Sequence, residues 1–339
     1  MILTPKNAPK STPKIAIEEH FSAPGFHEYS ADMARALPPE FLANLAAKLT
    51  DFDDERLAEM DAGNIEYAIL SQTTPGVQAE ADRTVAIRRA RENNEFLVNR
   101  IARHPSRLGA FAHVALQDPE AAAKELERTV VEYGFKGALI NGHTLGRYYE
   151  GSDFDVFWER AEALGVPVYL HPTAFSHMPA LLDGMPVLQG AAWGWGVETA
   201  GHALRLLFGG VFDRFPRLTL LLGHMGEFLP YQRWRIDSRF AACPMGIKLA
   251  RKPSEYIGSN ILITTAGVCS APSLLGAIGE IGPQAVLFSV DYPYESTADA
   301  CSFIEQAPLD EKTRAQVCHG NARRIFKIGS TDQLALLQC

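Results

Sequence analysis

Eight short apolar runs, separated by stretches with helical periodicity, constrain the fold of this chain more than any other feature of its sequence. Most are rich in β-branched or aromatic residues, which is typical of parallel strands covered on both faces. The runs are residues 15–20, 65–71, 108–115, 137–141, 166–171, 218–224, 260–265 and 286–291. Eight strand–helix units in one chain predict a closed (β/α)₈ barrel, an α/β fold.

The helical stretches between the runs have recognisable ends. Asp118 and Pro119 provide an N-cap and a proline at the first helical position, and Gly134 ends the pattern of residues 121–133. Within residues 152–165, apolar side chains recur at spacings of three and four: Phe154, Phe157, Trp158, Ala161 and Leu164. Such a stripe predicts packing against a core rather than a cofactor-binding box.

The composition allows one large domain. Of the 339 residues, 47% are hydrophobic and 21% are charged, and a barrel of this kind uses about 250 residues plus insertions. Residues 1–13 are polar and lack the apolar segment of a signal peptide, so we expect a loosely ordered tail, 1–13, and one barrel domain, 14–339. Two long connections after strands, 22–50 and 172–197, are expected to wall a substrate pocket at the C-terminal face.

Charge and cysteine content exclude several classes of function. The formal net charge is −8 and Lys and Arg form no cluster, so no nucleic-acid partner is expected. No run reaches the ~18 apolar residues of a membrane span. The five cysteines are scattered without a C-x-x-C pair, which argues against a disulfide framework or zinc ribbon and indicates reduced thiols in a cytoplasmic protein.

The first run ends in a pair of potential metal ligands. In the sequence KIAIEEHF, strand alternation places Glu18 and His20 on one face and Glu19 on the other. Taken alone, such a pair is more often a polar strand end than a binding site. The fifth run, however, ends at His171 and the eighth at Asp291. Because the carboxyl ends of barrel strands meet at one rim, these four side chains predict a converging cluster.

Imidazole and carboxylate ligands without thiolate suit a divalent ion with one position left open for substrate. We expect a single ion, Zn²⁺ ahead of Mn²⁺ and Mg²⁺. The sixth run stops at His224, and Glu227 follows three residues later. Glu227 is expected to orient that imidazole or to stabilise the start of the next helix, and the two roles are not exclusive.

Several longer segments carry a family resemblance that spans nearly the whole chain. They are residues 14–21 (KIAIEEHF), 135–141 (FKGALIN), 168–172 (VYLHP), 211–216 (VFDRFP), 222–227 (LGHMGE), 234–237 (WRID), 287–295 (LFSVDYPYE) and the closing helix at 320–327. At these residues the chain resembles the amidohydrolase superfamily. Within it, the chain is similar to the nonoxidative hydroxybenzoate decarboxylases, a branch that contains the γ-resorcylate, 2,3-dihydroxybenzoate and salicylate decarboxylases.

The resemblance implies a (β/α)₈ TIM barrel, often assembled as a dimer or tetramer, and assigns a role to each candidate residue. The metal ligands would be Glu18, His20, His171 and Asp291, the acid/base pair behind them His224 and Glu227, and the carboxylate-binding residue Arg235, acting in its own or a neighbouring subunit. Hydrolytic members usually have H-x-H on the first strand and often two metals with a bridging lysine. This chain has E-x-H and no obvious lysine at the end of the fourth run, which favours one metal and decarboxylation.

The implied activity is metal-dependent decarboxylation of an ortho-hydroxybenzoate, such as 2,6- or 2,3-dihydroxybenzoate, to CO₂ and a phenol. Asp291 would protonate the ring carbon, and the substrate's own phenol would act as electron sink, so no organic cofactor is expected. Phe21 and Tyr294 would either stack on the ring or pack in the core. The γ-resorcylate enzymes have histidine at the position of His20, where the 2,3-dihydroxybenzoate and salicylate enzymes typically have alanine.

Other activities fit the same residues. A superfamily hydrolase acting on a lactone or amide would use metal-bound water as nucleophile, and a decarboxylase of an acyclic semialdehyde acid is a further alternative. CO₂ release from a dihydroxybenzoate separates these activities. A catalytically silent barrel serving as a binding module predicts missing ligands, and none is missing from the sequence.

Overall fold

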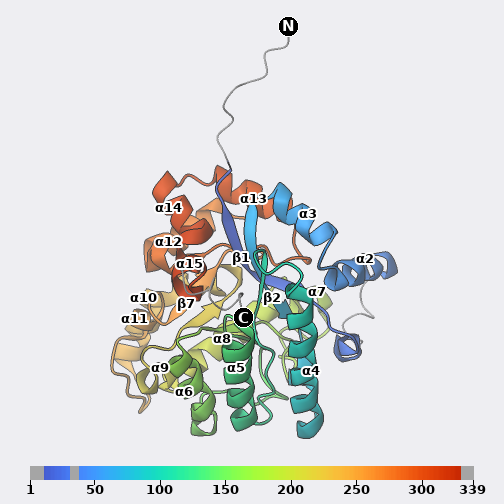
Figure 1. The fold of residues 1–339 in the computed structure, drawn as a ribbon. Helices are drawn as coiled ribbons and strands as arrows, with labels where there is room; N and C mark the ends of the chain where they lie inside the picture. Colours follow the sequence, from blue (N-terminus) through green and yellow to red (C-terminus); the bar gives the residue numbers. More distant parts are fainter. Residues whose placement is uncertain (1–10, 31–37, 330–339) are drawn as a thin grey trace.

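A ring of strands lies at the centre of the molecule and helices cover its outside (Figure 1). The computed structural model describes residues 11–30 and 38–329. The strands are β1 (Lys14–Phe21), β2 (Ile65–Gln72), β3 (Leu108–Ala110), β4 (Ala138–Asn141), β5 (Val168–His171), β6 (Leu220–Leu222), β7 (Ile261–Thr264) and β8 (Val286–Leu287). The α-helices are α2 (Pro39–Thr50), α3 (Glu55–Ala62), α4 (Arg83–Ile101), α5 (Pro119–Tyr133), α6 (Asp155–Leu164), α7 (Pro186–Gln189), α8 (Gly194–Phe208), α9 (Val211–Arg214), α10 (Leu229–Ala242), α11 (Pro253–Tyr256), α12 (Ala271–Ile281), α13 (Thr297–Gln306), α14 (Glu311–Ala315) and α15 (Asn321–Phe326).

Parallel pairing joins the strands in sequence order. One ladder contains β1, β2 and β3, and a second contains β4 to β8. A bridge between Ala112 and Ala138 links the end of β3 to β4, and a bridge between Glu19 and Tyr292 links β1 to the chain after β8. The two ladders therefore close into the (β/α)₈ barrel that the sequence predicts.

The helices predicted from their end signals are confirmed. The side chain of Asp118 accepts a hydrogen bond from the amide of Ala121, and Gly134 ends α5 with a φ of 70°, a conformation that glycine adopts without steric cost. In α6 and the 3₁₀ turn before it, the members of the predicted stripe Phe154, Phe157 and Trp158 are at most 2% exposed. These side chains cover the barrel from outside, which explains why the strands are apolar on both faces.

Three strands are less than half as long as the apolar runs that predicted them. β3 and β6 have three residues each and β8 has two. Beyond β8, side-chain hydrogen bonds replace the ladder, since the Ser289 hydroxyl accepts from the amides of Ile17 at 3.0 Å and Glu18 at 2.6 Å. An apolar run in the sequence indicates buried residues, and here the residues stay buried beyond the point where regular strand pairing ends.

The predicted tail and long connections lie only partly within the described residues. The described residues leave out both ends of the predicted domain scheme, 1–10 and 330–339. They also leave out residues 31–37 of the first connection. Ser11 and Thr12, assigned to the loose tail, are fixed to Glu305, since the Ser11 hydroxyl and the Thr12 amide donate to its Oε1 at 3.0 and 2.7 Å. The first connection contains α2, which sequence periodicity did not indicate, and the second contains α7 and the start of α8.

The described part of the chain also bears on the thiols and on membrane-spanning segments. Its four cysteines, Cys243, Cys269, Cys301 and Cys318, are free, and Cys339 lies beyond it. None of the helices between residues 11 and 329, the gap at 31–37 aside, combines the length and apolar character that crossing a membrane requires.

Candidate metal centre

Four potential metal ligands meet inside the barrel at the carboxyl ends of its strands. One ligand atom from each residue lies within 4.8 Å of the others: Glu18, His20, His171 and Asp291. His20 Nε2 is 3.1 Å from Asp291 Oδ1, and His171 Nε2 is 3.6 Å from Glu18 Oε1. The structure thus brings together, in a buried position, all four residues that the sequence predicted as ligands.

The junction between β1 and the end of β8 sets this geometry. Glu18 and His20 point into the barrel by strand alternation. The amide of Asp291 donates to the carbonyl of Glu18 at 3.0 Å, and the amide of His20 donates to that of Tyr292 at 2.6 Å. Asp291 has a φ of 77°, a left-handed conformation that Asp tolerates better than most residues. The turn at Asp291, rather than a strand, aims its carboxylate at His20.

Several atoms of this cluster lack hydrogen-bond partners. Among the described residues, none donates to or accepts from Glu18 Oε1, His20 Nε2 or Asp291 Oδ1. A buried polar atom left in this state costs about 1–3 kcal/mol, and three such atoms converging on one point are typical of ligands. Imidazole nitrogen and carboxylate oxygen are donors that divalent ions accept. The residues therefore fit a divalent metal ion.

A second layer of side chains fixes the orientation of the ligands. His171 Nδ1 donates to the Pro172 carbonyl at 2.9 Å, and Ser71 Oγ lies 3.2 Å from His20 Nδ1, so the Nε2 atom of each ring is free for a metal. The hydroxyl of Tyr169 donates to Glu18 Oε2. Neither Ser71 nor Tyr169 was predicted. Tyr169 shares the face of His171 by alternation, a signal that could have identified it.

Charges and burial perturb the ionisation of the cluster. Burial raises the pKa of Glu18 to about 7; the charge of His224 opposes this shift and that of Asp291 adds to it. Burial also holds the pKa of His171 well below its ordinary value. Burial favours the neutral form of Asp291 too, but the adjacent imidazoles of His20 and His224 outweigh it and lower the pKa of that carboxyl. Carboxylates and neutral imidazoles are the protonation states that bind metal.

A left-handed turn brings His224 and Glu227 together beside the cluster. Five consecutive residues from His224 to Phe228 have φ between 49° and 78°, a conformation that L-residues avoid and that is typically retained at functional sites. Within it, His224 Nδ1 donates to Glu227 Oε1 at 2.7 Å. Phe228, not Glu227, is the N-cap of α10, and no side chain in the described part of the molecule caps that helix. Of the two roles considered for Glu227, the structure therefore favours orienting the imidazole.

His224 also connects this pair to the cluster. Its Nε2 lies 3.5 Å from Asp291 Oδ2. Burial disfavours the imidazolium, but the charges of Glu227 and Glu18, with hydrogen bonds to Asp291 and Glu227, raise the pKa of His224 well above its ordinary value. His224 is thus positioned to hold a proton next to Asp291.

Phe21 does not reach the cluster, contrary to the prediction that it contacts substrate. The alternation that turns His20 inward turns Phe21 outward. Its side chain is 0% exposed and packs against Phe52 and Phe96, with ring centroids 5.6 and 6.3 Å away. Core packing, the alternative considered for this residue, is the correct interpretation.

Tyr294 and Arg235 occupy different positions relative to the cluster. The ring of Tyr294 lies edge-on to His20 at 5.6 Å, and its hydroxyl is 2.5 Å from Thr73 Oγ1. Arg235 is exposed on α10, next to Trp234, which is 77% exposed. Across residues 11–30 and 38–329, the side chain of Arg235 forms no hydrogen bond or ion pair. The structure therefore places Tyr294 beside the ligands, and it does not bring Arg235 to them.

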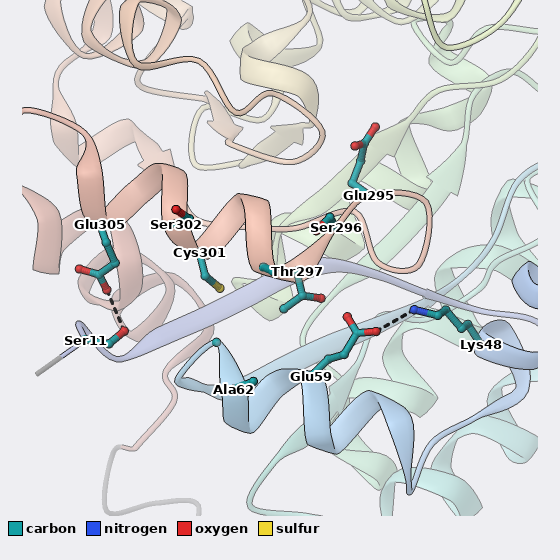
Figure 2. Close-up of a pocket in the computed structure, with 12 residues that line it drawn as sticks. Ser11, Lys48, Glu59, Ala62, Glu295, Ser296, Thr297, Cys301, Ser302 and Glu305 are labelled. Atoms are coloured by element: carbon teal, nitrogen blue, oxygen red, sulfur yellow. Dashed lines mark hydrogen bonds and ion pairs between the residues drawn. The ribbon is translucent and has the colours of Figure 1, made fainter.

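A separate cavity of about 560 Å³ lies on the outside of the barrel between α3 and α13. Figure 2 shows Thr297 and Cys301 of α13 facing α3, where Glu59 pairs with Lys48 at 2.7 Å. None of the four clustered ligands lines this cavity, and its lining contains no buried polar atom without a partner in the described chain. The candidate site is therefore the ligand cluster and not this cavity.

Comparisons with known proteins agree with this geometry. Residues 20–328 match the amidohydrolase family model. The chain is 42% identical over 326 residues to the γ-resorcylate decarboxylase of Polaromonas sp. (strain JS666), which covers 93% of this chain and 98% of that protein. It is similar to a crystal structure of 2,6-dihydroxybenzoate decarboxylase complexed with 2,6-dihydroxybenzoate, at 42% identity and a TM-score of 0.88, covering 94% of this chain and 100% of that one. It is also similar to the dihydroxybenzoic acid decarboxylase from Polaromonas sp. JS666, solved with manganese and the inhibitor 2-nitroresorcinol, at 41% identity and a TM-score of 0.89, covering 95% and 99% of the two chains.

Replacing His20 by alanine is expected to remove metal binding while the barrel stays folded. Even outer partners of a metal ligand contribute about 10–100-fold to affinity, so loss of the ligand itself should cost more than about 100-fold. Ser71→Ala, which only removes the hydroxyl beside His20 Nδ1, is the matched control and should cost about 10-fold. For both variants, metal content is measured after dialysis against a chelator, and circular dichroism checks the fold. One metal ion per chain in His20→Ala would contradict the assignment of His20 as a ligand.

Proposed function

The chain belongs to the amidohydrolase family and is a metal-dependent hydroxybenzoate decarboxylase, a carboxy-lyase, and we propose that its substrate is 2,6-dihydroxybenzoate (γ-resorcylate). The observation that carries this proposal is the buried ligand group with histidine at position 20, in a chain 42% identical to an enzyme named for that substrate. As an enzyme of aromatic acid catabolism, it is proposed to work in the cytoplasm.

The four clustered residues are proposed to hold one divalent ion. Two carboxylates and two imidazoles suit Zn²⁺ and Mn²⁺ alike. Zn²⁺ is the ion predicted from the sequence, whereas a similar solved structure contains manganese, so these are the two ions to compare. When bound, the ion supplies a Lewis acid that holds the substrate carboxylate and its ortho hydroxyl.

Asp291 is proposed as the proton donor to the ring. Its Oδ2 lies 3.5 Å from His224 Nε2, so the imidazolium that Glu227 stabilises can supply it with a proton. Asp291 then protonates the ring carbon that bears the carboxylate. The bond to the carboxylate breaks, its electron pair returns to the ring, and CO₂ leaves. Each turnover consumes one proton and produces a phenol.

Tyr294 is proposed to form a wall for the aromatic ring of the substrate. Its hydroxyl is fixed by Thr73 and its ring by His20, while 39% of the residue stays exposed. An aromatic side chain immobilised beside the ligands offers a face or an edge to a second ring at little entropic cost.

Arg235 is proposed to bind carboxylate in the site of a neighbouring subunit. It lies on an exposed stretch of α10 beside Trp234, and an apolar side chain with 77% exposure is typical of a surface that a partner covers. In a dimer with two-fold symmetry, each copy would supply the other with its guanidinium. A guanidinium binds carboxylate through two parallel hydrogen bonds, a geometry unavailable to lysine.

Purified enzyme is expected to release CO₂ from 2,6-dihydroxybenzoate without an organic cofactor, and to release less from 2,3-dihydroxybenzoate and salicylate. Chelation should abolish turnover, and Mn²⁺ or Zn²⁺ should restore it to different extents, which identifies the better ion. Lactones and amides serve as the comparison panel. Hydrolysis of these compounds without CO₂ release from any hydroxybenzoate would replace the proposal by the hydrolase alternative.

The variant Asp291→Asn is expected to lose activity by at least about 10³-fold, because an amide keeps an oxygen ligand but cannot donate a carboxylic proton, and general acid catalysis contributes about 10²–10⁴-fold. Metal content should stay near that of the wild type. The measurement is single-turnover CO₂ release alongside metal analysis. Near-normal turnover in metal-replete Asp291→Asn would eliminate Asp291 as the donor.

Mixing two inactive variants tests the placement of Arg235. Arg235→Ala should lower kcat/KM by about 100-fold through loss of a charge-assisted pair. If Arg235 acts across an interface, co-expression with Asp291→Asn creates mixed dimers with one intact site, and activity should rise to about a quarter of the wild type in a statistical mixture. Activity that stays at the level of the separate variants would exclude a role in the partner's site. Sedimentation of the same samples reports the oligomeric state.

A further inference from the structure

Helix α8 carries a buried polar face that the proposed reaction does not use. Glu198 and His202 are four residues apart on this helix, which places them on one face, and they are 3% and 0% exposed. Within the described residues, neither oxygen of Glu198 and neither ring nitrogen of His202 has a hydrogen-bond partner. Unpaired buried groups are rare in native proteins, and each calls for an explanation.

Two ionisable side chains from other elements interact with Glu198. Tyr148, after β4, favours the charged form of Glu198, and Glu227, after β6, opposes it. The nearby cation Arg205 is engaged elsewhere, since it stacks on the ring of Tyr148 at 4.7 Å and pairs with Glu150. His202, on the same helix, is held neutral by burial, which lowers its pKa to about 3. Within the described ranges, therefore, no cation is hydrogen-bonded to Glu198.

The start of α8 also presses against Glu227. A Cβ atom at Gly196 would lie 2.8 Å from Glu227 Oε2, while the other oxygen accepts from His224 Nδ1 at 2.7 Å. Glu227 is 3% exposed. Its carboxylate thus lies between His224 and α8, against the helix turn that leads to Glu198.

We propose that Glu198 is a positioning residue for the His224–Glu227 pair, and that it acts by remaining protonated beside Glu227. Two buried carboxylates that face each other without a cation do not both ionise readily. Glu227 takes the charge because His224 donates to it, and Glu198 keeps the proton. This inference rests on the proposed function, because the pair serves Asp291.

Ionisation of Glu198 is expected to disturb the pair. Burial, opposed by Tyr148 and reinforced by the charge of Glu227, raises the pKa of Glu198 from 4.5 to about 7. Above this pH a second negative charge appears against Glu227 and repels it from its position next to His224. Turnover should then decline as pH rises through neutrality.

The test compares kcat between pH 5.5 and 9 in the metal-loaded wild type, Glu198→Gln, Glu198→Asp and Tyr148→Phe. Glutamine cannot ionise, so the alkaline decline should move up by one pH unit or more. Aspartate should retain it. Tyr148→Phe removes the hydroxyl that favours the charged form, so the decline should move up as well. Glu159→Gln, the same chemical change at an exposed carboxylate on α6, is the control and should leave the decline in place.

Thermal unfolding of the same proteins tests the protonated state of Glu198 without relying on activity. When folding raises the pKa of a carboxyl, the folded protein loses stability as the pH rises from the pKa in the unfolded state to the pKa in the folded state. The unfolding temperature of Glu198→Gln relative to the wild type should therefore increase between pH 4.5 and about 7 and level off above.

The outcomes separate this inference from the proposed function. An alkaline decline that is identical in the wild type, Glu198→Gln and Tyr148→Phe would overturn the positioning role while the decarboxylase stands. A constant difference in unfolding temperature across the pH range would overturn the buried protonated acid. Absence of CO₂ release from every hydroxybenzoate in the wild type would reject the proposed function and, with it, the positioning role.

Discussion

The hydrogen-bonded junction between β1 and the end of β8 is the constraint on which the metal centre depends. The main chains of Glu18 and Asp291 bond to each other at 3.0 Å, and those of His20 and Tyr292 at 2.6 Å. The residues that supply ligand atoms thus also close the barrel with their backbone. Barrel closure, more than the choice of side chains, fixes how close the two carboxylates come.

Strand alternation and strand ends are local properties, so the sequence could predict Glu18, His20 and His171 as converging residues. The same rule, applied consistently, also turns Phe21 away from His20 and places Tyr169 on the face of His171, so it could have identified the position of both side chains. Ser71 had no local signal at all, because its contact with His20 exists only when β1 and β2 are neighbours.

The turn from His224 to Phe228 marks a different limit of sequence reasoning. Five positive φ angles in succession run against the conformational preference of L-residues, and only Gly226 among them announces such a geometry. The three-residue spacing of His224 and Glu227 in the sequence predicted a pair, but a right-handed turn would also have brought the two side chains together. Contacts elsewhere in the fold hold this turn, and they are not encoded in its own sequence.

The short ladder of β8 has a consequence for the life of the protein in the cell. Only two residues of that strand pair regularly. The chain beyond them is held to β1 by the backbone hydrogen bonds that also position the ligands. A molecule in which this junction has not formed is therefore also an open barrel with exposed strand edges and apolar surface, which chaperones and proteases recognise. Cellular quality control of the fold would in this way also remove the chains whose ligands are misplaced because the barrel has not closed.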